Sequence, residues 1–105
     1  MPPSERMQTM ASAWLSDPAG NALTRATLRA LREQADEYHA AARRGGSFEA
    51  DLKYVQARSA YEALRAAELA AVRAWISAKY GPGYAGSYYA SEVIAVACRE
   101  LRRMA

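Results

Sequence analysis

Side chains that commonly carry catalysis are scarce in this chain. It has one histidine, His39, and one cysteine, Cys98. A zinc site or an activated nucleophile needs several such groups close together, and no histidine lies near Cys98 in the sequence. We interpret His39 as a surface residue beside an arginine-rich strip, and Cys98 as a small buried thiol at the edge of an apolar stripe. We therefore expect no catalytic residue, no metal site and no cofactor, and predict that the protein is not an enzyme.

Three glycines, at positions 81, 83 and 86, match the pattern G-x-G-x-x-G. In dinucleotide-binding proteins this pattern follows a β-strand and opens a helix inside a strand–helix–strand unit. Here a helical stretch precedes it and no strand pattern is visible, so we reject a dinucleotide site. The free N–H groups of the next helix, with the hydroxyls of Ser87 and Ser91, offer a weaker alternative, an anion site. A plain turn between two helices is the better interpretation.

Four tyrosines surround this glycine-rich loop, and a tryptophan precedes it. Tyrosine presents a large amphipathic surface at low entropic cost, which is typical of binding surfaces. The alternative is that two of the four tyrosines simply pack the loop against the neighbouring helices. We predict that the loop binds a partner through these residues: Tyr80, Tyr84, Tyr88, Tyr89 and Trp75.

Twelve of the fourteen basic residues are arginine, a side chain that favours bidentate contacts with phosphate and carboxylate. Two groups, one on the second predicted helix and one near the C-terminus, are Arg25, Arg29, Arg32, Arg43, Arg99, Arg102 and Arg103. The first group is partly neutralised by pairs four residues apart, Arg29 with Glu33 and Arg32 with Asp36. A solvated face is therefore favoured, and a nucleic-acid-binding surface is the alternative.

Glu68 stands between Leu64 and Val72, where the helical pattern expects an apolar side chain. A buried carboxylate is costly unless it is paired. Three interpretations are open. The carboxylate lies at the seam edge in water, it pairs with an arginine across an interface, or it belongs to a site with a raised pKa. We favour the first two.

All of these side chains depend on one long stretch, residues 47–80, which contains neither proline nor glycine. Its apolar positions recur at alternating spacings of three and four residues, the period of a seam between two helices. As a single helix it would be about 50 Å long, at about 1.5 Å per residue, whereas a compact domain of this size is about 30 Å across. The stretch therefore needs a long helical partner.

The other elements follow from caps and turns. Residues 1–5 are expected to be disordered, with Ser4 capping a short helix that ends near Ser16 and a turn over 16–21. A second helix over 22–44 is predicted to bury Leu28, Leu31, Ala35, Tyr38 and Ala42. Gly45-Gly46 then leaves a short connection, which makes 22–80 an antiparallel helical hairpin.

A last helix is predicted over about 88–104. The fold class is therefore all-α, a single bundle-like domain of residues 1–105 with about four helices around a long central one. The long helix overhangs its partner over about 69–80, and the first helix, the last helix or a second copy must cover that overhang. We expect the seam near Trp75 to stay open and to share the partner-binding surface with the tyrosine loop.

Composition narrows the function classes further. The formal charge is +3, no apolar run approaches the roughly 20 residues needed to cross a bilayer, and the N-terminus lacks the apolar core of a signal peptide. We therefore expect a soluble, cytoplasmic protein that does not bind membranes. The leading hypothesis is a non-catalytic interaction module that forms a homodimer and binds a protein partner, such as a small regulator or inhibitor carried by a bacterium, phage or plasmid. The alternative is a nucleic-acid-binding regulator that uses the arginine-rich helix faces.

Overall fold

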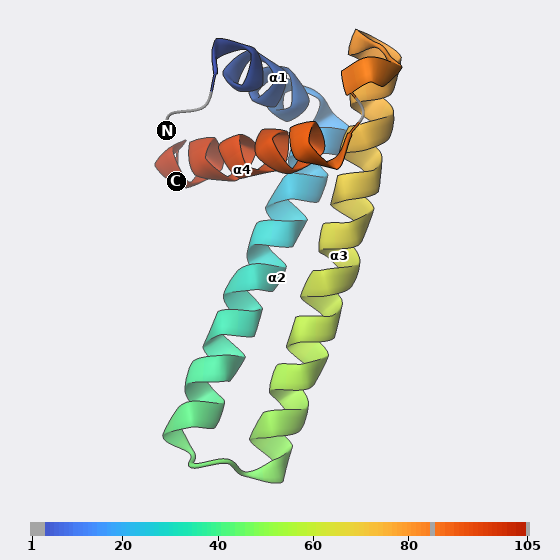
Figure 1. Cartoon of the computed structure of the whole chain (residues 1–105). Helices are drawn as coiled ribbons and strands as arrows, with labels where there is room; N and C mark the ends of the chain where they lie inside the picture. Colours follow the sequence, from blue (N-terminus) through green and yellow to red (C-terminus); the bar gives the residue numbers. More distant parts are fainter. Residues whose placement is uncertain (1–3, 85, 105) are drawn as a thin grey trace.

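A computed structural model describes residues 4–84 and 86–104 of the chain. Its elements are α1 (Glu5–Ser16), α2 (Pro18–Arg43), α3 (Phe48–Tyr80), the 3₁₀ turn η1 (Pro82–Tyr84) and α4 (Ser87–Met104). No strand occurs in this described part, so the all-α prediction is confirmed. α2 and α3 lie side by side as an antiparallel hairpin, and α1 and α4 gather at the end opposite the hairpin turn (Figure 1). Most of the segment expected to be disordered, residues 1–3, lies outside the described residues.

α3 is the single unbroken helix that the seam spacing predicts. The Ser47 hydroxyl caps it by accepting a hydrogen bond from the N–H of Ala50 over 3.2 Å, and Glu49 and Asp51 place negative charge where the helix dipole favours it. Gly81 ends the helix at a φ of 102°, in the left-handed region that suits glycine. With its 33 residues, α3 sets the 49 Å length of the molecule. None of the described helices combines the length and the apolar character needed to cross a membrane.

The hairpin connection predicted at Gly45-Gly46 is confirmed. α2 ends at Arg43, and both glycines have positive φ, 68° and 78°. Glycine adopts this conformation without the steric cost that a Cβ would bring. The chain can therefore reverse within a few residues and lay α3 alongside α2.

α2 begins at Pro18, four residues before its predicted start. Asp17 caps it, with Oδ1 accepting a hydrogen bond from the N–H of Ala19 over 2.9 Å, and proline fits the first helical turn because no N–H is needed there. The predicted turn is therefore wrong from Pro18 onward. Glycine suits position 20 because α1 packs closely against it: a Cβ there would clash with the backbone carbonyl oxygen of Trp14 and lie 2.7 Å from Cδ2 of its ring.

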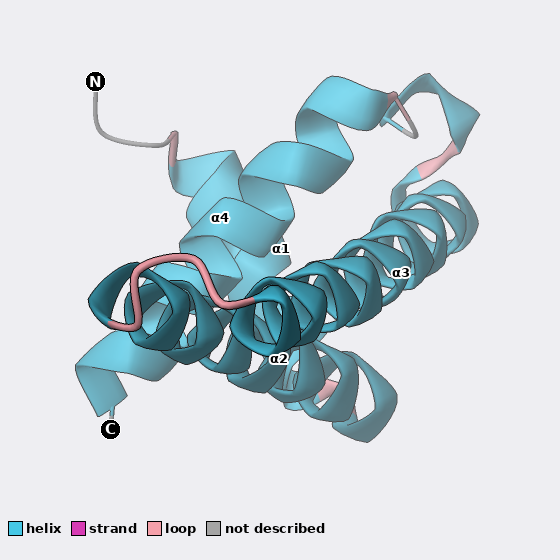
Figure 2. Ribbon diagram, turned by 90° about the horizontal axis from the view of Figure 1, so that it is seen from below, coloured by secondary structure: helices cyan, strands magenta, loops and turns pink. Residues whose placement is uncertain are grey.

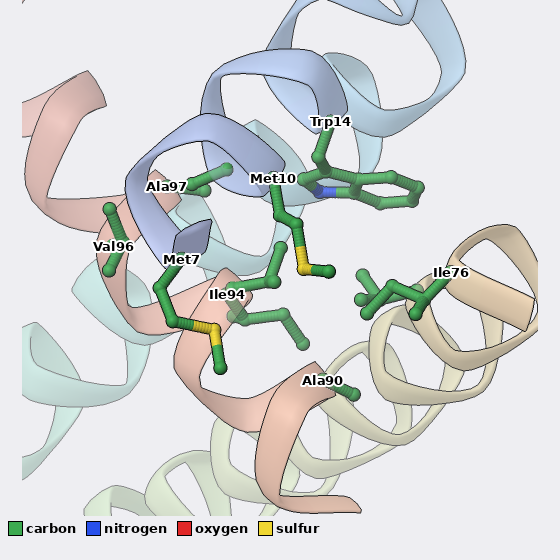
Figure 3. Packing of buried hydrophobic residues seen from close by; sticks show 11 residues of the cluster. Met7, Met10, Trp14, Ile76, Ala90, Ile94, Val96 and Ala97 are labelled. Carbon is green, nitrogen blue, oxygen red and sulfur yellow. The ribbon is translucent and has the colours of Figure 1, made fainter. Parts of the chain in front are cut away.

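The hydrophobic core lies where α1 and α4 pack against the last part of α3. Its buried members include Met10 and Trp14 of α1, Ile76 of α3 and Ile94 of α4 (Figure 3). The indole N–H of Trp14 donates a hydrogen bond to the hydroxyl of Thr24 over 2.9 Å, which ties α1 to α2. Figures 1 and 2 show α1 and α4 lying across the hairpin axis rather than along it. These two helices therefore cover one end of the hairpin only.

The overhang of α3, residues 69–80, is covered by this packing. Val72 and Ile76 are fully buried, and Trp75 meets Trp14 edge to face with ring centroids 5.4 Å apart. The expectation of an open seam near Trp75 is therefore corrected, because α1 and α4 fill it. Large apolar side chains stay exposed instead near the hairpin turn. They are Tyr38, Phe48, Leu52 and Val55, with 56%, 82%, 45% and 55% of their surface exposed.

Candidate functional site

The tyrosine loop, which was predicted to bind a partner, packs against the hydrophobic core. The Tyr84 hydroxyl accepts a hydrogen bond from the Arg6 guanidinium over 2.9 Å, and that guanidinium also lies 5.1 Å from the centre of the Tyr84 ring. Tyr80 packs against Trp75 at 5.8 Å, and Tyr89 packs against Tyr84 at 5.5 Å. These four aromatic rings are partly buried against the hydrophobic core. Their contacts hold α1, η1 and the ends of α3 and α4 together.

Tyr88 differs from the other predicted aromatic residues because 69% of its surface is exposed. Its ring meets the Tyr89 ring edge to face, with the ring centroids 5.6 Å apart. The nearby Lys79 ammonium lies 5.1 Å from the Trp75 ring and 5.8 Å from the Tyr80 ring. Of the five predicted aromatic residues, the structure therefore gives four a packing role and leaves Tyr88 accessible.

A groove of about 410 Å³ lies between α2 and α4. This volume lies within the range of about 300–1,000 Å³ found for ligand pockets. Its lining combines four arginines with four apolar residues: Arg25, Arg29, Arg32, Arg102, Leu28, Leu31, Ala35 and Leu101. Hereafter it is the arginine groove. The two arginine groups that the sequence suggested separately therefore contribute to one surface.

The groove exists because α2 turns a different face to the core than its apolar spacing predicts. The buried positions of α2 include Thr24, Thr27 and Ala30, whereas the stripe that begins at Leu28 and Leu31 stays partly or fully exposed. Thr24 is drawn inward by the Trp14 indole, and the Thr27 hydroxyl is satisfied by the carbonyl of Leu23 over 3.0 Å. The predicted burial of this stripe is therefore wrong. Its leucines face the arginine groove instead.

The arginines of the groove are not neutralised by carboxylates of the described chain. The predicted pairs, Arg29 with Glu33 and Arg32 with Asp36, are not formed; the ion pairs within 4.0 Å involve other residues. Arg25 instead donates a hydrogen bond to the side-chain oxygen of its neighbour Asn21 over 2.7 Å. The groove is therefore positively charged as well as partly apolar.

The remaining predicted arginines lie elsewhere. Arg43 lines a shallow hollow with His39 and Ala42 near the hairpin turn. Arg99 is exposed on α4, and Arg103 pairs with Glu100 over 3.6 Å. These three arginines are separate from the groove, so the structure does not support one continuous basic face.

A smaller cavity of about 140 Å³ adjoins the groove, since both are lined by Leu28, Leu31 and Arg102. Glu68 lines it and is completely buried. The Arg65 guanidinium lies 3.6 Å from the Glu68 carboxylate, yet neither carboxylate oxygen makes a hydrogen bond of good geometry, and Nη1 of Arg65 has no such partner either. The interpretation of Glu68 as a seam-edge residue in water is therefore wrong. Its counter-ion stands on the same helix.

Burial raises the pKa of Glu68 above its ordinary value of 4.5. The Thr24 hydroxyl and the Arg65 guanidinium offset this rise only in part. Because the single Thr27 proton is given to a backbone carbonyl, Thr24 is the better donor toward the carboxylate. Burial likewise raises the pKa of the half-buried Cys98 thiol, and the Glu68 charge adds to that effect. A raised pKa makes this thiol a weak nucleophile at neutral pH.

The described residues contain no group of three or more His, Cys, Asp or Glu side chains close enough to hold a metal ion. Comparison with protein-family models, with curated proteins and with solved structures gave no significant match. The arginine groove brings guanidinium groups and apolar side chains together in one concave surface. Sequence reasoning named its arginines but missed Leu28, Leu31 and Leu101 as site residues, because their helical spacing is equally typical of a core.

Proposed function

We propose that this protein is a non-catalytic helical interaction module that holds an acidic, amphipathic helix of a protein partner in the arginine groove. The observation that carries the proposal is the combination, in one groove, of four guanidiniums without carboxylate partners and the half-buried leucines Leu28 and Leu31. A groove that is both basic and apolar is complementary to a helix that is acidic on its flanks and apolar on one face.

The chemistry of each part of the groove supports this occupant. Arginine forms bidentate hydrogen bonds with carboxylates, so Arg29 and Arg102, which approach from opposite helices, can hold acidic side chains in fixed positions. The half-buried Leu28 and Leu31 offer apolar surface that a partner helix would remove from water. The leucine stripe continues along α2 toward Tyr38, so a helix of several turns could follow it.

A nucleic acid is the second candidate, because the same guanidiniums can neutralise phosphates. The exposed Arg99 on α4 favours this alternative. The leucine lining speaks against it, since a phosphate backbone gains nothing from contact with apolar side chains. We therefore place the protein partner first.

Under this proposal the protein acts by binding a partner rather than by catalysing a reaction. That activity suits a small cytoplasmic regulator or inhibitor of the kind carried by a bacterium, phage or plasmid. Tyr88, exposed at the start of α4, could extend the contact surface beyond the groove.

The decisive experiment reverses charge inside and outside the groove. The groove variant carries Arg29→Glu and Arg102→Glu, and the matched control carries Arg43→Glu and Arg44→Glu, which lie outside it. Calorimetric titration with a designed helix of leucines on one face and glutamates on its flanks should show affinity falling about tenfold or more for the groove variant and little for the control. Equal losses in both variants would contradict the proposal.

Duplex DNA serves as the competing probe in the same titrations. A nucleic-acid-binding protein should bind the duplex with an affinity that falls steeply between about 50 mM and 200 mM salt. Both charge reversals should then weaken binding similarly, since phosphate contacts depend on summed charge. Salt-sensitive duplex binding, without binding of the acidic helix, would replace the first candidate by the second.

A further inference from the structure

α3 is apolar on two opposite sides. One side faces α2 and the core and carries Ala50, Glu68 and Val72. At about 100° per residue, the side turned away from them carries six apolar residues, three large and then three small, with Ser59 between the two groups and Arg73 after them: Phe48, Leu52, Val55, Ala63, Ala66 and Ala70. All six are exposed. Hereafter this side is the outer face of α3.

The outer face has no neighbour within the described chain. Figure 1 shows α1, α2 and α4 to the left of α3 and nothing to its right. α1 and α4, which cover the other side of the helix between Val72 and Ile76, leave Ala66 and Ala70 exposed. The outer face also points away from the arginine groove, which lies between α2 and α4. An occupant of the outer face would therefore leave the groove open.

The size pattern of this face makes it complementary to itself when two copies run antiparallel. If a two-fold axis passes near position 61, Leu52 of one copy stands level with Ala70 of the other, because each lies nine residues from the axis. By the same count Phe48 meets Ala74, and Val55 lies level with the turn that contains Ala66. Each large side chain then falls opposite a small one. Small residues allow helix axes to approach to about 8 Å, the close end of the usual range.

A parallel arrangement lacks this fit. It would set Phe48 against Phe48 and Ala66 against Ala66, so the bulky end would hold the helices apart where the alanines require close approach. The alternation of large and small residues thus selects one orientation. Self-complementarity of this kind is what a two-fold symmetric interface requires.

Charges along one flank of the outer face select the same alignment. Asp51, Arg58 and Glu62 share this flank at about 100° per residue. Within one chain Arg58 and Glu62 form an exposed ion pair of 3.0 Å. In the antiparallel pair described above, Arg58 of each copy lies on the same flank as Glu62 of the other and about 3 Å from its level along the axis, an offset of two residues. Opposite charges therefore meet near the two-fold axis, where Arg58 and Glu62 of the two copies approach each other.

We propose that the chain forms an antiparallel homodimer through the outer face of α3, with the two α3 helices in contact over positions 48–74. The occupant of this face is a second copy, because the size pattern and the charge pattern both fit the same face read in reverse. The two arginine grooves then lie on the outside of the dimer. One dimer can hold two partner segments.

The first test is the molecular mass in solution by analytical ultracentrifugation over a range of protein concentrations. The wild type should sediment as a dimer, and Ala66→Glu should sediment as a monomer. The matched control is Ala60→Glu, which adds the same charge to an exposed alanine of α3 about a quarter turn from the outer face. Circular dichroism must show that both variants keep their helix content. A monomeric wild type, or equal behaviour of the two variants, would overturn the proposal.

The second test reports orientation and uses a Cys98→Ser background. One chain carries Leu52→Cys and the other carries Ala70→Cys. After the two are mixed and oxidised, the antiparallel pair should give the mixed disulfide in excess over either self-disulfide, because only facing positions come within bridging distance. Self-disulfides of the Leu52→Cys chain in excess would indicate a parallel pair and overturn the alignment. The arginine-groove titration is independent of both outcomes, so the two proposals fail separately.

Discussion

The two ends of the hairpin are built from the same pair of helices but are stabilised in different ways. The head consists of α1, α4 and residues 69–80 of α3, and it buries large side chains such as Met10, Trp14 and Ile76 between three helices. The tip, around the Gly45-Gly46 turn, has only α2 and α3. Its principal large contact is the ring pair of Tyr38 and Tyr54 at 5.7 Å. Tertiary packing therefore stabilises the head, whereas the tip relies more on helix propensity.

This difference indicates that stability and the proposed binding surfaces belong to different parts of the hairpin. Alanine is the best helix former but buries little surface, so an alanine-rich tip can stay helical without a core of its own. The apolar side chains that the tip leaves exposed are then free for other molecules. The head supplies the stability, and the surfaces proposed for the partner helix and for the second copy extend along the hairpin toward the tip.

The largest expected effect comes from truncating the centre of the head. Trp14→Ala should lower the free energy of unfolding by about 3–5 kcal/mol, since it removes a buried indole and its hydrogen bond to Thr24. Phe48→Ala, at an exposed position of the tip, should change it by no more than about 0.5 kcal/mol in the monomer. Urea unfolding followed by circular dichroism at low protein concentration measures both. Similar losses would show that head and tip do not differ as described.

A backbone change in the head should have the next largest effect. Gly20→Ala normally favours a helix, yet here the new Cβ would meet the Trp14 ring, so we expect a loss of about 1–3 kcal/mol from overpacking. The same urea experiment measures it. If the variant is more stable than the wild type, α1 does not press on α2 at this point.

Glu68→Gln, at the border between head and tip, should stabilise the protein by about 1 kcal/mol near neutral pH. The raised pKa of Glu68 means that the folded protein keeps this proton at pH values where the unfolded chain has lost it. Folding therefore loses stability from this group as pH rises from about 4.5 toward the folded pKa. The advantage of the variant should accordingly shrink as pH falls and nearly vanish below about 4.5.

Unfolding midpoints of the wild type and Glu68→Gln at several pH values test this expectation. Glu62→Gln is the matched control, because Glu62 is an exposed carboxylate on the same helix. A pH-independent difference between Glu68→Gln and the wild type would contradict a raised pKa at Glu68.

The smallest effect concerns local opening. Backbone amides of the tip should exchange hydrogen faster than those of the head, since few buried contacts hold the tip closed. If α3 pairs with a second copy, amides near Val55 should become more protected as the protein concentration rises, and those near Tyr38 on α2 should not. Hydrogen exchange at two concentrations, read by mass spectrometry, separates the two cases. Uniform protection along the hairpin would remove the distinction between its ends.

Much of the fold could be predicted from the sequence because its signals are local. The Ser47 cap, the glycines at 45 and 46 and the three-and-four spacing along 47–80 each depend on neighbours within one or two turns. Pro18 was misjudged for a related reason: proline ends a helix in its interior but begins one in its first turn. Only the Asp17 cap decides between the two.

The candidate site was harder to predict because it depends on contacts between distant segments. The spacing of Leu28 and Leu31 shows an apolar stripe, but not that Thr24 and Thr27 take the inner position on α2. Arg102 joins the α2 arginines only because α4 lies across the hairpin. In the same way, the covering of Trp75 followed from the placement of α1, which no local pattern specifies.

The contact between Trp14 and Trp75, with ring centroids 5.4 Å apart, gathers both tryptophans of the chain in the head. Tryptophan fluorescence will therefore report the melting of one end of the molecule and not of the other. Fraying of the hairpin turn would reduce ellipticity before the emission maximum shifts, and two optical signals from unmodified protein would then trace two separate transitions.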